Sequence, residues 1–334
     1  MGEEEECLKK PESLDLPSNC DLPFLTYGLF KPGQLAFSQI KNRCKKRKIP
    51  VYIEGTLQHV NGMPVLLKKY DEDLDFPVKG YIIEFIKDRG TSAYKTICNS
   101  KDMHIYSWDT VEHNGEEVNV LVSADPRKMI NLFENPDADV STLDLYDYNW
   151  THDPVYKNAL RFLDSRLDDL GSKIRLYGYD DIEKYSLLFV ETQSLYMVLW
   201  SALDRFLTFR YSMYQTTNIK QLSEDPIFKK AIENCVDSDF TVTSAQNLKQ
   251  ITVSKNNPKC CAQYYYTLRN NVVHSGKMNV RETRKLFKAL LELKSIFKYL
   301  LTDVEDEGYE IEAEFYSTIE DELNADKNPI KFKS

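Results

Sequence analysis

The sequence lacks the features that would place it in a membrane or send it through a secretory pathway. No run of about twenty apolar residues occurs, so no transmembrane helix is expected. The first ten residues, MGEEEECLKK, carry acids where a secretory signal needs bases, and no apolar stretch follows them. We therefore expect a cytoplasmic protein.

Metal-binding patterns are also missing, although cysteine and histidine are present. The seven cysteines form no C-x-x-C pair, and the five histidines include no H-E-x-x-H motif. An odd number of cysteines at irregular spacing favours reduced thiols over a disulfide framework. We expect no metal and no cofactor.

Basic residues are fewer than acidic ones, but the excess of acidic residues lies near the two ends of the chain. The net charge is −9, and Asp303–Asp326 holds eleven acids and no base, while Glu3–Glu6 adds four more acids. Without these two segments the remainder is slightly basic, so charge does not exclude a nucleic-acid partner. The acidic ends are expected to be solvated tails, with a partner-binding strip as the alternative.

Residues 21–130, which follow an acidic leader at 1–20, are expected to form a β-rich domain. Strands are predicted at LPFLTYGLF, VYIEGTLQHV, PVLLKKY and FPVKGYIIEFI. A hairpin is expected around Asn114–Gly115, because Asn-Gly suits a two-residue turn. The basic run Lys41–Lys48 could contact phosphates, although a solvated charged face is favoured.

Residues 131–150 are acidic and contain turn formers, which indicates a linker. Beyond them, in residues 151–304, apolar residues recur at steps of three and four, as in a helical bundle. One helix is expected to end at Gly171 and another to run from Pro258 to Gly276. Residues 305–334 are expected to be an acidic tail. The predicted fold class is α+β, with a β domain followed by an all-α domain.

Four short motifs in the first half resemble the gamma-glutamylcyclotransferase-like family, and the resemblance covers about residues 23–125. The motifs are Tyr27-Gly28-Leu29-Phe30-Lys31-Pro32-Gly33, Glu54-Gly55-Thr56-Leu57, Pro64-Val65-Leu66 and Val78-Lys79-Gly80-Tyr81-Ile82-Ile83. The resemblance implies a small mixed β-barrel. It also implies a pocket at the first motif, where backbone N–H groups meet an anionic ligand. The ligand-binding residues would be Tyr27, Gly28, Leu29, Phe30 and Gly33.

The same family uses a glutamate beyond the fourth motif as general acid/base. Here no glutamate lies between Glu84 and Glu112, and Cys98 or Asn99 stands near the expected place. Neither relays a proton as a carboxylate does near neutral pH, and a nucleophilic role for Cys98 is disfavoured. We therefore expect a domain that keeps the pocket but lacks cyclotransferase activity. Such a domain would sense a ligand, regulate the second domain, or serve as a scaffold.

The stretch Arg269-Asn270-Asn271-Val272-Val273-His274 fits the pattern R-polar-x-x-x-H and resembles HEPN-domain ribonucleases, which are helical bundles. The resemblance covers about residues 150–303. It implies a metal-independent endoribonuclease that acts on RNA as a homodimer, in toxin or antiviral defence systems. The implied catalytic residues are Arg269, Asn270 and His274. Imidazole can accept the 2′-OH proton near neutral pH, and guanidinium suits phosphate.

Structural roles for the same residues are the alternative. Residues five apart on a helix diverge by about 140°, so Arg269 could pair with Asp204 while His274 caps helix carbonyls. The side chains of Tyr264–Tyr266 could stack on bases, although Tyr265 is favoured as core. Met197, Trp200 and Phe206 are assigned to the core. Two other functions stay open: a non-catalytic dimeric interaction or scaffold protein, and a gamma-glutamylcyclotransferase-type enzyme.

Overall fold

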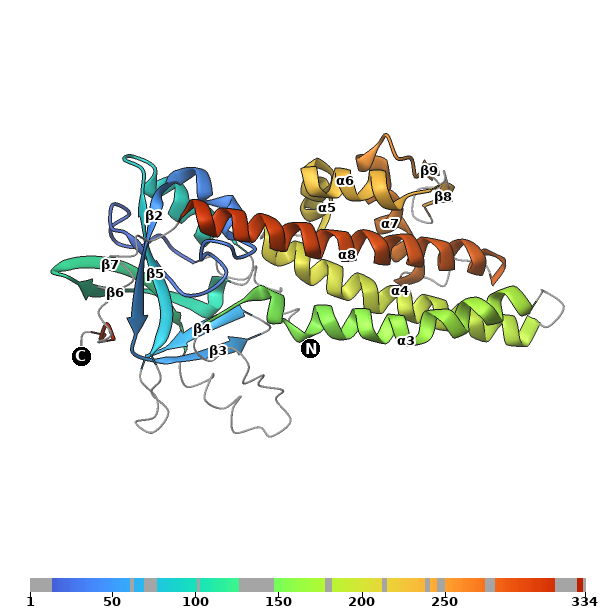
Figure 1. Cartoon of the computed structure of the whole chain (residues 1–334), viewed down its shortest axis with the longest axis horizontal. Helices are drawn as coiled ribbons and strands as arrows, with labels where there is room; N and C mark the ends of the chain where they lie inside the picture. Colours follow the sequence, from blue (N-terminus) through green and yellow to red (C-terminus); the bar gives the residue numbers. More distant parts are fainter. Residues whose placement is uncertain are drawn as a thin grey trace, which may run out of the picture. The chain divides into compact units, whose positions relative to one another are not determined.

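The chain divides into two compact units, one of which is inserted into the sequence of the other (Figure 1). Unit 1 consists of Met1–His152 and Glu307–Ser334, and unit 2 consists of Asp153–Asp306. The computed structural model describes residues 14–60, 63–68, 77–100, 103–125, 147–177, 182–211, 215–237, 241–244, 250–273, 280–315 and 329–332. The protein combines a mixed α/β region with a helical C-terminal region.

Unit 1 is built on a five-stranded sheet with the order β2-β5-β1-β7-β6. The central strand β1 is antiparallel to β5 and parallel to β7. Two further strands, β3 and β4, form a separate antiparallel pair. The bounds are β1 Phe24–Thr26, β2 Cys44–Ile53, β3 Thr56–Val60, β4 Met63–Leu67, β5 Val78–Phe85, β6 Tyr106–His113 and β7 Glu116–Ser123.

The hairpin that the sequence predicts at Asn114–Gly115 is confirmed. Strands β6 and β7 pair through His113 and Glu116, so only two residues form the turn. Both have a positive φ, 53° at Asn114 and 83° at Gly115. Asparagine and glycine tolerate this left-handed backbone, which explains why the local sequence was sufficient to locate the turn.

The expected closed barrel is not found in the described residues, because the sheet has two edges, β2 and β6. Single bridges join the C-terminal segment to both edges, Ile330 to Ile53 of β2 and Phe332 to Val111 of β6. These residues partly cover edge strands that would otherwise be open to pairing. Residues 329–332 therefore pair with the sheet, although the sequence suggested a solvated tail.

Short helices complete unit 1. Helix α1 spans Gly90–Cys98, and its Tyr94 is fully buried, with its hydroxyl donating to the carbonyl of Leu22 at 2.9 Å. The 3-10 turns are η1 Phe37–Gln39, η2 Lys41–Arg43, η3 Met103–Ile105 and η5 Trp150–His152.

Unit 2 is mainly helical, as the periodicity predicts, with one short strand pair that the sequence did not suggest. Asp153 and Asp225 cap two of the helices, each accepting from the N–H two residues later and each followed by proline. The bounds are α3 Pro154–Leu176, α4 Ile182–Tyr211, α5 Gln215–Glu224, α6 Pro226–Cys235, β8 Thr241–Thr243, β9 Gln250–Thr252, α7 Pro258–Val273, η6 Val280–Glu282 and α8 Thr283–Glu314.

Gly171 does not end a helix, contrary to the expectation from sequence. Helix α3 continues through it to Leu176, and a Cβ atom at Gly171 would lie 2.9 Å from Cζ of Phe287. The glycine is therefore needed for the close approach of α3 to the Phe287 ring. Helix α8 likewise runs beyond its predicted end at residue 304, and its last turns, residues 307–314, belong to unit 1.

One helix of the described ranges, α4, is long and apolar enough by length and composition to cross a membrane. Half of its most apolar window is buried inside the structure, and the core helix of a soluble protein meets the same criterion. Trp200 and Phe206 are buried in the core as expected, whereas Met197 is only half-buried. Burial in the fold thus accounts for much of the apolar character of α4.

Candidate functional sites

Arg269 lies near the C-terminal end of α7 with its side chain half-buried. Its Nη1 donates to Oδ1 of Asn270 at 3.1 Å, and its Nε is buried without a hydrogen-bond partner in the described part of the chain. Within those same residues no ion pair joins Arg269 to Asp204, which the alternative interpretation had suggested. The guanidinium therefore keeps donors that a ligand could use.

The rest of α7 holds Arg269 and Asn270 in place. Leu268 is fully buried, and the hydroxyl of Tyr196 on α4 donates to the carbonyl of Tyr265 at 2.8 Å. The amide of Asn271 donates to the carbonyl of Thr243 on β8 at 2.9 Å. These contacts fix the helix that carries the two candidate catalytic residues.

His274, the third candidate catalytic residue, lies outside the described residues. The structure therefore brings together two of the three predicted side chains, Arg269 and Asn270, through one hydrogen bond. The position of the imidazole relative to them stays a prediction.

The three tyrosines that precede Arg269 have different environments. Tyr264 and Tyr265 are 0% and 1% exposed, so neither is available to stack on a base. Tyr265 is in the core, as favoured from sequence. Tyr266 is half-buried, with its ring centroid 6.0 Å from that of Trp200. Tyr266 is thus the member of this group that could still contact a base.

Glu292 on α8 is a buried carboxylate that the sequence analysis missed. Tyr265 donates its hydroxyl to Oε2 of Glu292 at 3.3 Å, while Oε1 is buried without a partner among the described residues. Burial raises the pKa of Glu292 above its ordinary value. Its spacing of three and four residues from Ala289 and Ile296, both buried, was the available signal.

A second candidate site is a small pocket in unit 1, partly open to solvent, with a cavity volume of about 20 Å³. Four of the five predicted ligand-binding residues, Tyr27, Gly28, Leu29 and Phe30, line it, and Gly33 does not. The remaining lining residues come from several strands and turns: Phe24, Thr26, Met63, Pro64, Met103, Tyr106 and Leu121.

The two pocket tyrosines have structural hydrogen bonds. The hydroxyl of Tyr27 donates to the carbonyl of Leu121 at 2.8 Å and accepts the N–H of Leu66 at 3.1 Å. Burial raises the pKa of Tyr27 far above its usual range. Tyr106 donates to the carbonyl of Pro64 at 2.6 Å. No carboxylate or imidazole is among the described lining residues, so the pocket offers no acid/base of suitable pKa.

Cys98 and Asn99 do not supply the missing general base, because neither lines the pocket. The thiol of Cys98 donates to the carbonyl of Asp15 at 3.3 Å. Burial raises the pKa of Cys98 to about 11, so the nucleophilic thiolate is scarce near neutral pH. Asn99 is exposed at the end of α1.

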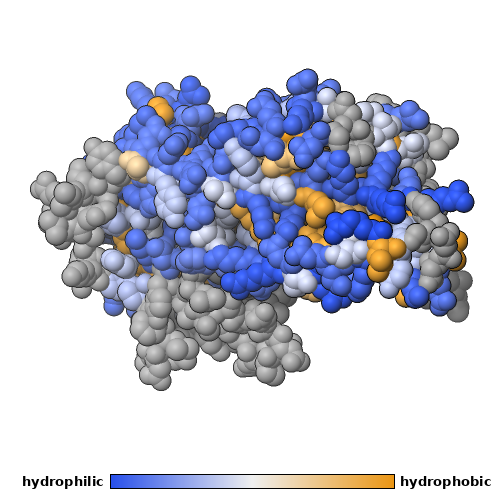
Figure 2. All heavy atoms as spheres, turned by 45° about the vertical axis from the view of Figure 1, so that its right-hand side comes forward, coloured by the Kyte–Doolittle hydropathy of each residue, from blue (hydrophilic) through white to orange (hydrophobic). Residues whose placement is uncertain are grey.

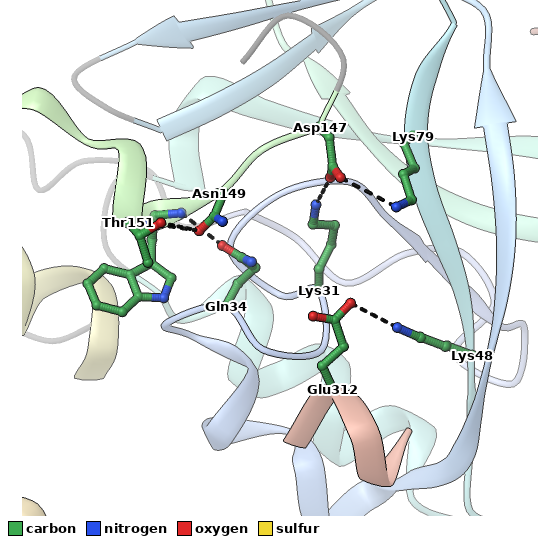
Figure 3. Close-up of polar contacts among 9 residues, drawn as sticks. Lys31, Gln34, Lys48, Lys79, Asp147, Asn149, Thr151 and Glu312 are labelled. Atoms are coloured by element: carbon green, nitrogen blue, oxygen red, sulfur yellow. Dashed lines mark hydrogen bonds and ion pairs between the residues drawn. The ribbon is translucent and has the colours of Figure 1, made fainter. Parts of the chain in front are cut away.

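Three lysines of unit 1, one of them in the pocket loop at residues 27–34, lie beside carboxylates (Figure 3). Lys31 of the loop pairs with Asp147, which also lies 3.5 Å from Nζ of Lys79 on β5. Lys48 on β2 pairs with Glu312 on α8 at 2.9 Å. We call these five residues the lysine cluster. Lys31 and Lys48 are only 4% and 6% exposed, so each buried charge depends on its carboxylate partner.

The electrostatic environment differs between the lysines of this cluster. Burial lowers the pKa of Lys31, and the charge of Asp147 opposes that effect. Burial also acts to lower the pKa of Lys79, but interactions with Tyr81 and Asp147 outweigh it and raise the pKa to about 12. The ring of Tyr81 also lies 4.5 Å from Nζ of Lys48, a cation–π distance.

The pocket loop also holds the segments of unit 1 that adjoin unit 2 in the chain. Oε1 of Gln34 accepts the N–H of Trp150 at 3.0 Å (Figure 3). Gly33, with φ of 84°, lies so close to Gly308 that a Cβ atom on Gly308 would be 2.8 Å from the Gly33 carbonyl oxygen. One end of loop 27–34 therefore lines the pocket, while the other end anchors both junctions.

The basic run Lys41–Lys48 and the acidic segment after residue 303 pair with each other. Lys41 and Lys46 both contact Glu314, the former at 2.9 Å, and Lys48 contacts Glu312. The expectation of a solvated face holds for the exposed Lys46 but is wrong for the buried Lys48. Much of the run forms strand β2, which points Lys48 inward.

No group of three or more potential metal ligands occurs in the described ranges.

Comparison of the chain with protein families and with curated proteins gave no match. A solved structure of an uncharacterized protein from Pyrococcus horikoshii is similar, at 14% identity and a TM-score of 0.25, over 31% of this chain and 79% of that chain. A likeness that weak carries no argument about fold or function.

Proposed function

We propose that the protein is a metal-independent endoribonuclease of the HEPN type, with the cleavage site on unit 2. Unit 1 would be a gamma-glutamylcyclotransferase-like domain without cyclotransferase activity that senses a ligand or regulates. The observation that carries the proposal is the state of Arg269. Its guanidinium is half-buried, bonded to Asn270 and free of carboxylate partners among the described residues.

Other arginines of unit 2 illustrate the difference. Arg205 pairs with Asp153 at 2.7 Å, and Arg210 pairs with Asp225 at 3.0 Å. Those two pairs fasten α4 to the caps of α3 and α6, so their charge is already used. Arg269 keeps its charge for an external anion, and a planar fork of donors suits the two free oxygens of a phosphodiester.

The proposed chemistry needs no metal. His274 accepts the proton of the ribose 2′-OH, and the 2′ oxygen attacks the adjacent phosphorus. The bond from phosphorus to the 5′ oxygen breaks, and that oxygen leaves after gaining a proton. Arg269 stabilises the charge on the phosphorane oxygens, and Asn270 orients the phosphate or the histidine. The products carry 2′,3′-cyclic phosphate and 5′-OH ends.

A homodimer through the helical unit would place two such motifs at one cleft. Apolar side chains at the paired ends of α3 and α4 supply a surface for it: Leu176, Ile182, Leu187 and Val190 are 56% to 76% exposed. Figure 2 shows one face of the molecule on which hydrophobic residues reach the surface between hydrophilic ones. Exposed apolar patches of this kind often mark protein interfaces. The setting we propose is a cytoplasmic toxin or antiviral defence effector.

A regulatory role for unit 1 is supported by loop 27–34. A ligand that displaced Leu29 or Phe30 would move the start of this loop. The rest of the loop pairs with Asp147, accepts the N–H of Trp150 and packs against Gly308. These are the segments through which the chain enters and leaves unit 2. A ligand in the pocket would thus act on the segments of unit 1 that hold Trp150 and Gly308.

The test is RNA cleavage by the purified full-length protein in EDTA. Arg269→Ala and His274→Ala should each reduce the cleavage rate by about 100-fold or more, as expected for loss of a charge stabiliser or a general base. Arg161→Ala and His104→Ala, at exposed positions, are matched controls and should retain the rate. Cleavage that survives both active-site substitutions, or no cleavage by the wild-type protein, contradicts the proposal.

A non-catalytic dimeric interaction protein is the second candidate, and the exposed apolar surface of α3 and α4 favours it equally. A stable dimer that cleaves no RNA would establish this alternative. Cyclotransferase activity has less support, because the pocket lacks a carboxylate among its described lining residues. Release of 5-oxoproline from gamma-glutamyl substrates would establish cyclotransferase activity as the function.

A further inference from the structure

Residues 329–332 cross between the two edge strands of the sheet in unit 1 (Figure 1). Ile330 forms a parallel bridge with Ile53 at the end of β2, and Phe332 forms an antiparallel bridge with Val111 of β6. Among the strands that the structure describes, β2 and β6 each have only one neighbour within the sheet. One short extended segment therefore lies on the open sides of both edges.

Main-chain hydrogen bonds hold this segment on β2. The N–H of Ile330 donates to the carbonyl of Tyr52 at 2.7 Å, and its carbonyl accepts the N–H of Glu54 at 3.0 Å. Such bonds require an extended backbone and do not depend on the side chains of the bound strand. We call the edge groups of Tyr52, Glu54 and Val111 the docking edge.

The side chains of the segment alternate in their environment, as in a strand that lies on a sheet edge. Ile330 is 8% exposed, Lys331 is exposed, and Phe332 is half-buried. Nζ of Lys331 lies 4.0 Å from the Glu54 carboxylate, and Nζ of Lys68 lies 5.3 Å from the centre of the Phe332 ring. The docking edge therefore suits an apolar residue, then a basic residue, then an aromatic residue.

The segment uses little of what the two edges offer. Strand β2 spans ten residues and β6 spans eight, yet in the described ranges each bridges the segment at one residue, Ile53 or Val111. A longer extended strand would pair with more residues along these edges. A competing strand would therefore gain bonds that residues 329–332 do not make.

We propose that the docking edge binds an extended segment of a partner protein, and that residues 329–332 occupy it until that segment displaces them. The partner segment carries an apolar, a basic and an aromatic residue in succession and adds a strand to the sheet. Ile330 and Phe332 mark the two inward positions that it must match. The proposal does not depend on the nuclease site, because it concerns unit 1 and binding is measured without RNA.

A second copy of the chain is the less suitable occupant. It carries the same residues 329–332, so exchange between copies would replace two bridges with two identical bridges. A segment of the same chain is also present at a higher effective concentration than one on a separate molecule. Exchange therefore gains no contact, whereas a longer partner strand does.

A fluorescent peptide of residues 328–334, NPIKFKS, is the probe, and anisotropy measures its binding to the full-length protein. Ile330→Asp places a carboxylate at a buried position and should release the chain's own segment. This variant should bind the peptide at least about tenfold more tightly than the wild type, in which the tethered segment competes. Lys331→Ala, at the adjacent exposed position, is the matched control and should behave as the wild type.

Two further measurements locate the bound peptide. In the Ile330→Asp protein, Glu54→Pro removes a main-chain donor of the docking edge and should weaken peptide binding at least about tenfold. A peptide with aspartate in place of its isoleucine should not bind the Ile330→Asp protein. If the double variant fails to fold, the aspartate peptide decides.

The proposal is overturned if Ile330→Asp binds the peptide no more tightly than the wild type, if neither protein binds it, or if the aspartate peptide binds equally well. Circular dichroism that shows Ile330→Asp to be unfolded also overturns it, because residues 329–332 would then be a required strand that no partner displaces. A wild-type dimer that Ile330→Asp dissociates would assign the docking edge to a second copy, against a partner protein.

Discussion

Lys31 is almost completely buried, yet its ion-pair partner Asp147 is 46% exposed. The lysine therefore carries most of the desolvation cost, and the carboxylate offsets it from the edge of the solvent. Asp147→Asn should leave a buried cation with a weaker partner and lower the free energy of unfolding by about 1–2 kcal/mol, a value discounted for the exposure of Asp147. Urea unfolding midpoints of the full-length protein measure this.

The companion variants make this prediction specific. Lys31→Met removes the buried charge itself and should cost less than Asp147→Asn, and the double variant should behave like Lys31→Met alone. Asp169→Asn, which breaks the exposed pair with Lys173, should shift the midpoint little. Equal effects of Asp147→Asn and Asp169→Asn would contradict the assigned role of the Lys31 pair.

Glu292 should make the stability of unit 2 depend on pH. Its folded-state pKa is raised, so the native state binds more protons than the unfolded state, and stability is lost as pH rises through the folded pKa. Glu292→Gln keeps an acceptor for the hydroxyl of Tyr265. It should equal the wild type at pH 4 and exceed its stability at pH 8 by about 1 kcal/mol. Denaturation midpoints at both pH values test this.

The control is Glu310→Gln, which changes an exposed carboxylate on the same helix and should alter stability at neither pH. A Glu292→Gln variant that is less stable than the wild type at pH 8 would mean that the fold favours the charged carboxylate. That outcome is the opposite of what burial of Glu292 predicts.

The exposed apolar side chains of α4 should matter for self-association. Leu187 and Val190 lie three residues apart, on one face of the helix, and are 67% and 56% exposed. Leu187→Asp should convert a dimer into a monomer in sedimentation velocity and lower RNA cleavage with it. Tyr309→Asp, at an exposed position outside unit 2, should change neither. A wild-type protein that is monomeric at all concentrations contradicts the dimer proposal.

Local sequence was sufficient for features that depend on a few neighbouring residues. The Asn114–Gly115 turn, the helix start at Pro258 and the core positions Trp200 and Phe206 are examples. The helix end predicted at Gly171 was wrong, because a glycine that ends a helix and a glycine that permits close helix packing look alike in sequence. Only the ring of Phe287 distinguishes the two roles.

Long-range pairs could not be predicted from one sequence. Lys31 and Asp147 are 116 residues apart, and Lys48 and Glu312 are 264 residues apart. Charge composition indicated a basic run and an acidic segment, but not that β2 turns Lys48 inward toward α8. For the candidate nuclease site, the sequence supplied Arg269 and Asn270. The absence of an ion pair between Arg269 and Asp204 in the described residues required the structure.

The most direct test of the nuclease proposal compares an RNA oligonucleotide with its 2′-O-methyl counterpart, each incubated with the full-length protein in EDTA. We expect the RNA alone to be cut, with 2′,3′-cyclic phosphate and 5′-OH ends, and Arg269→Ala to abolish the cut. Cleavage of the 2′-O-methyl strand, a requirement for added metal, or undiminished cleavage by Arg269→Ala would contradict attack by the 2′-OH at this site.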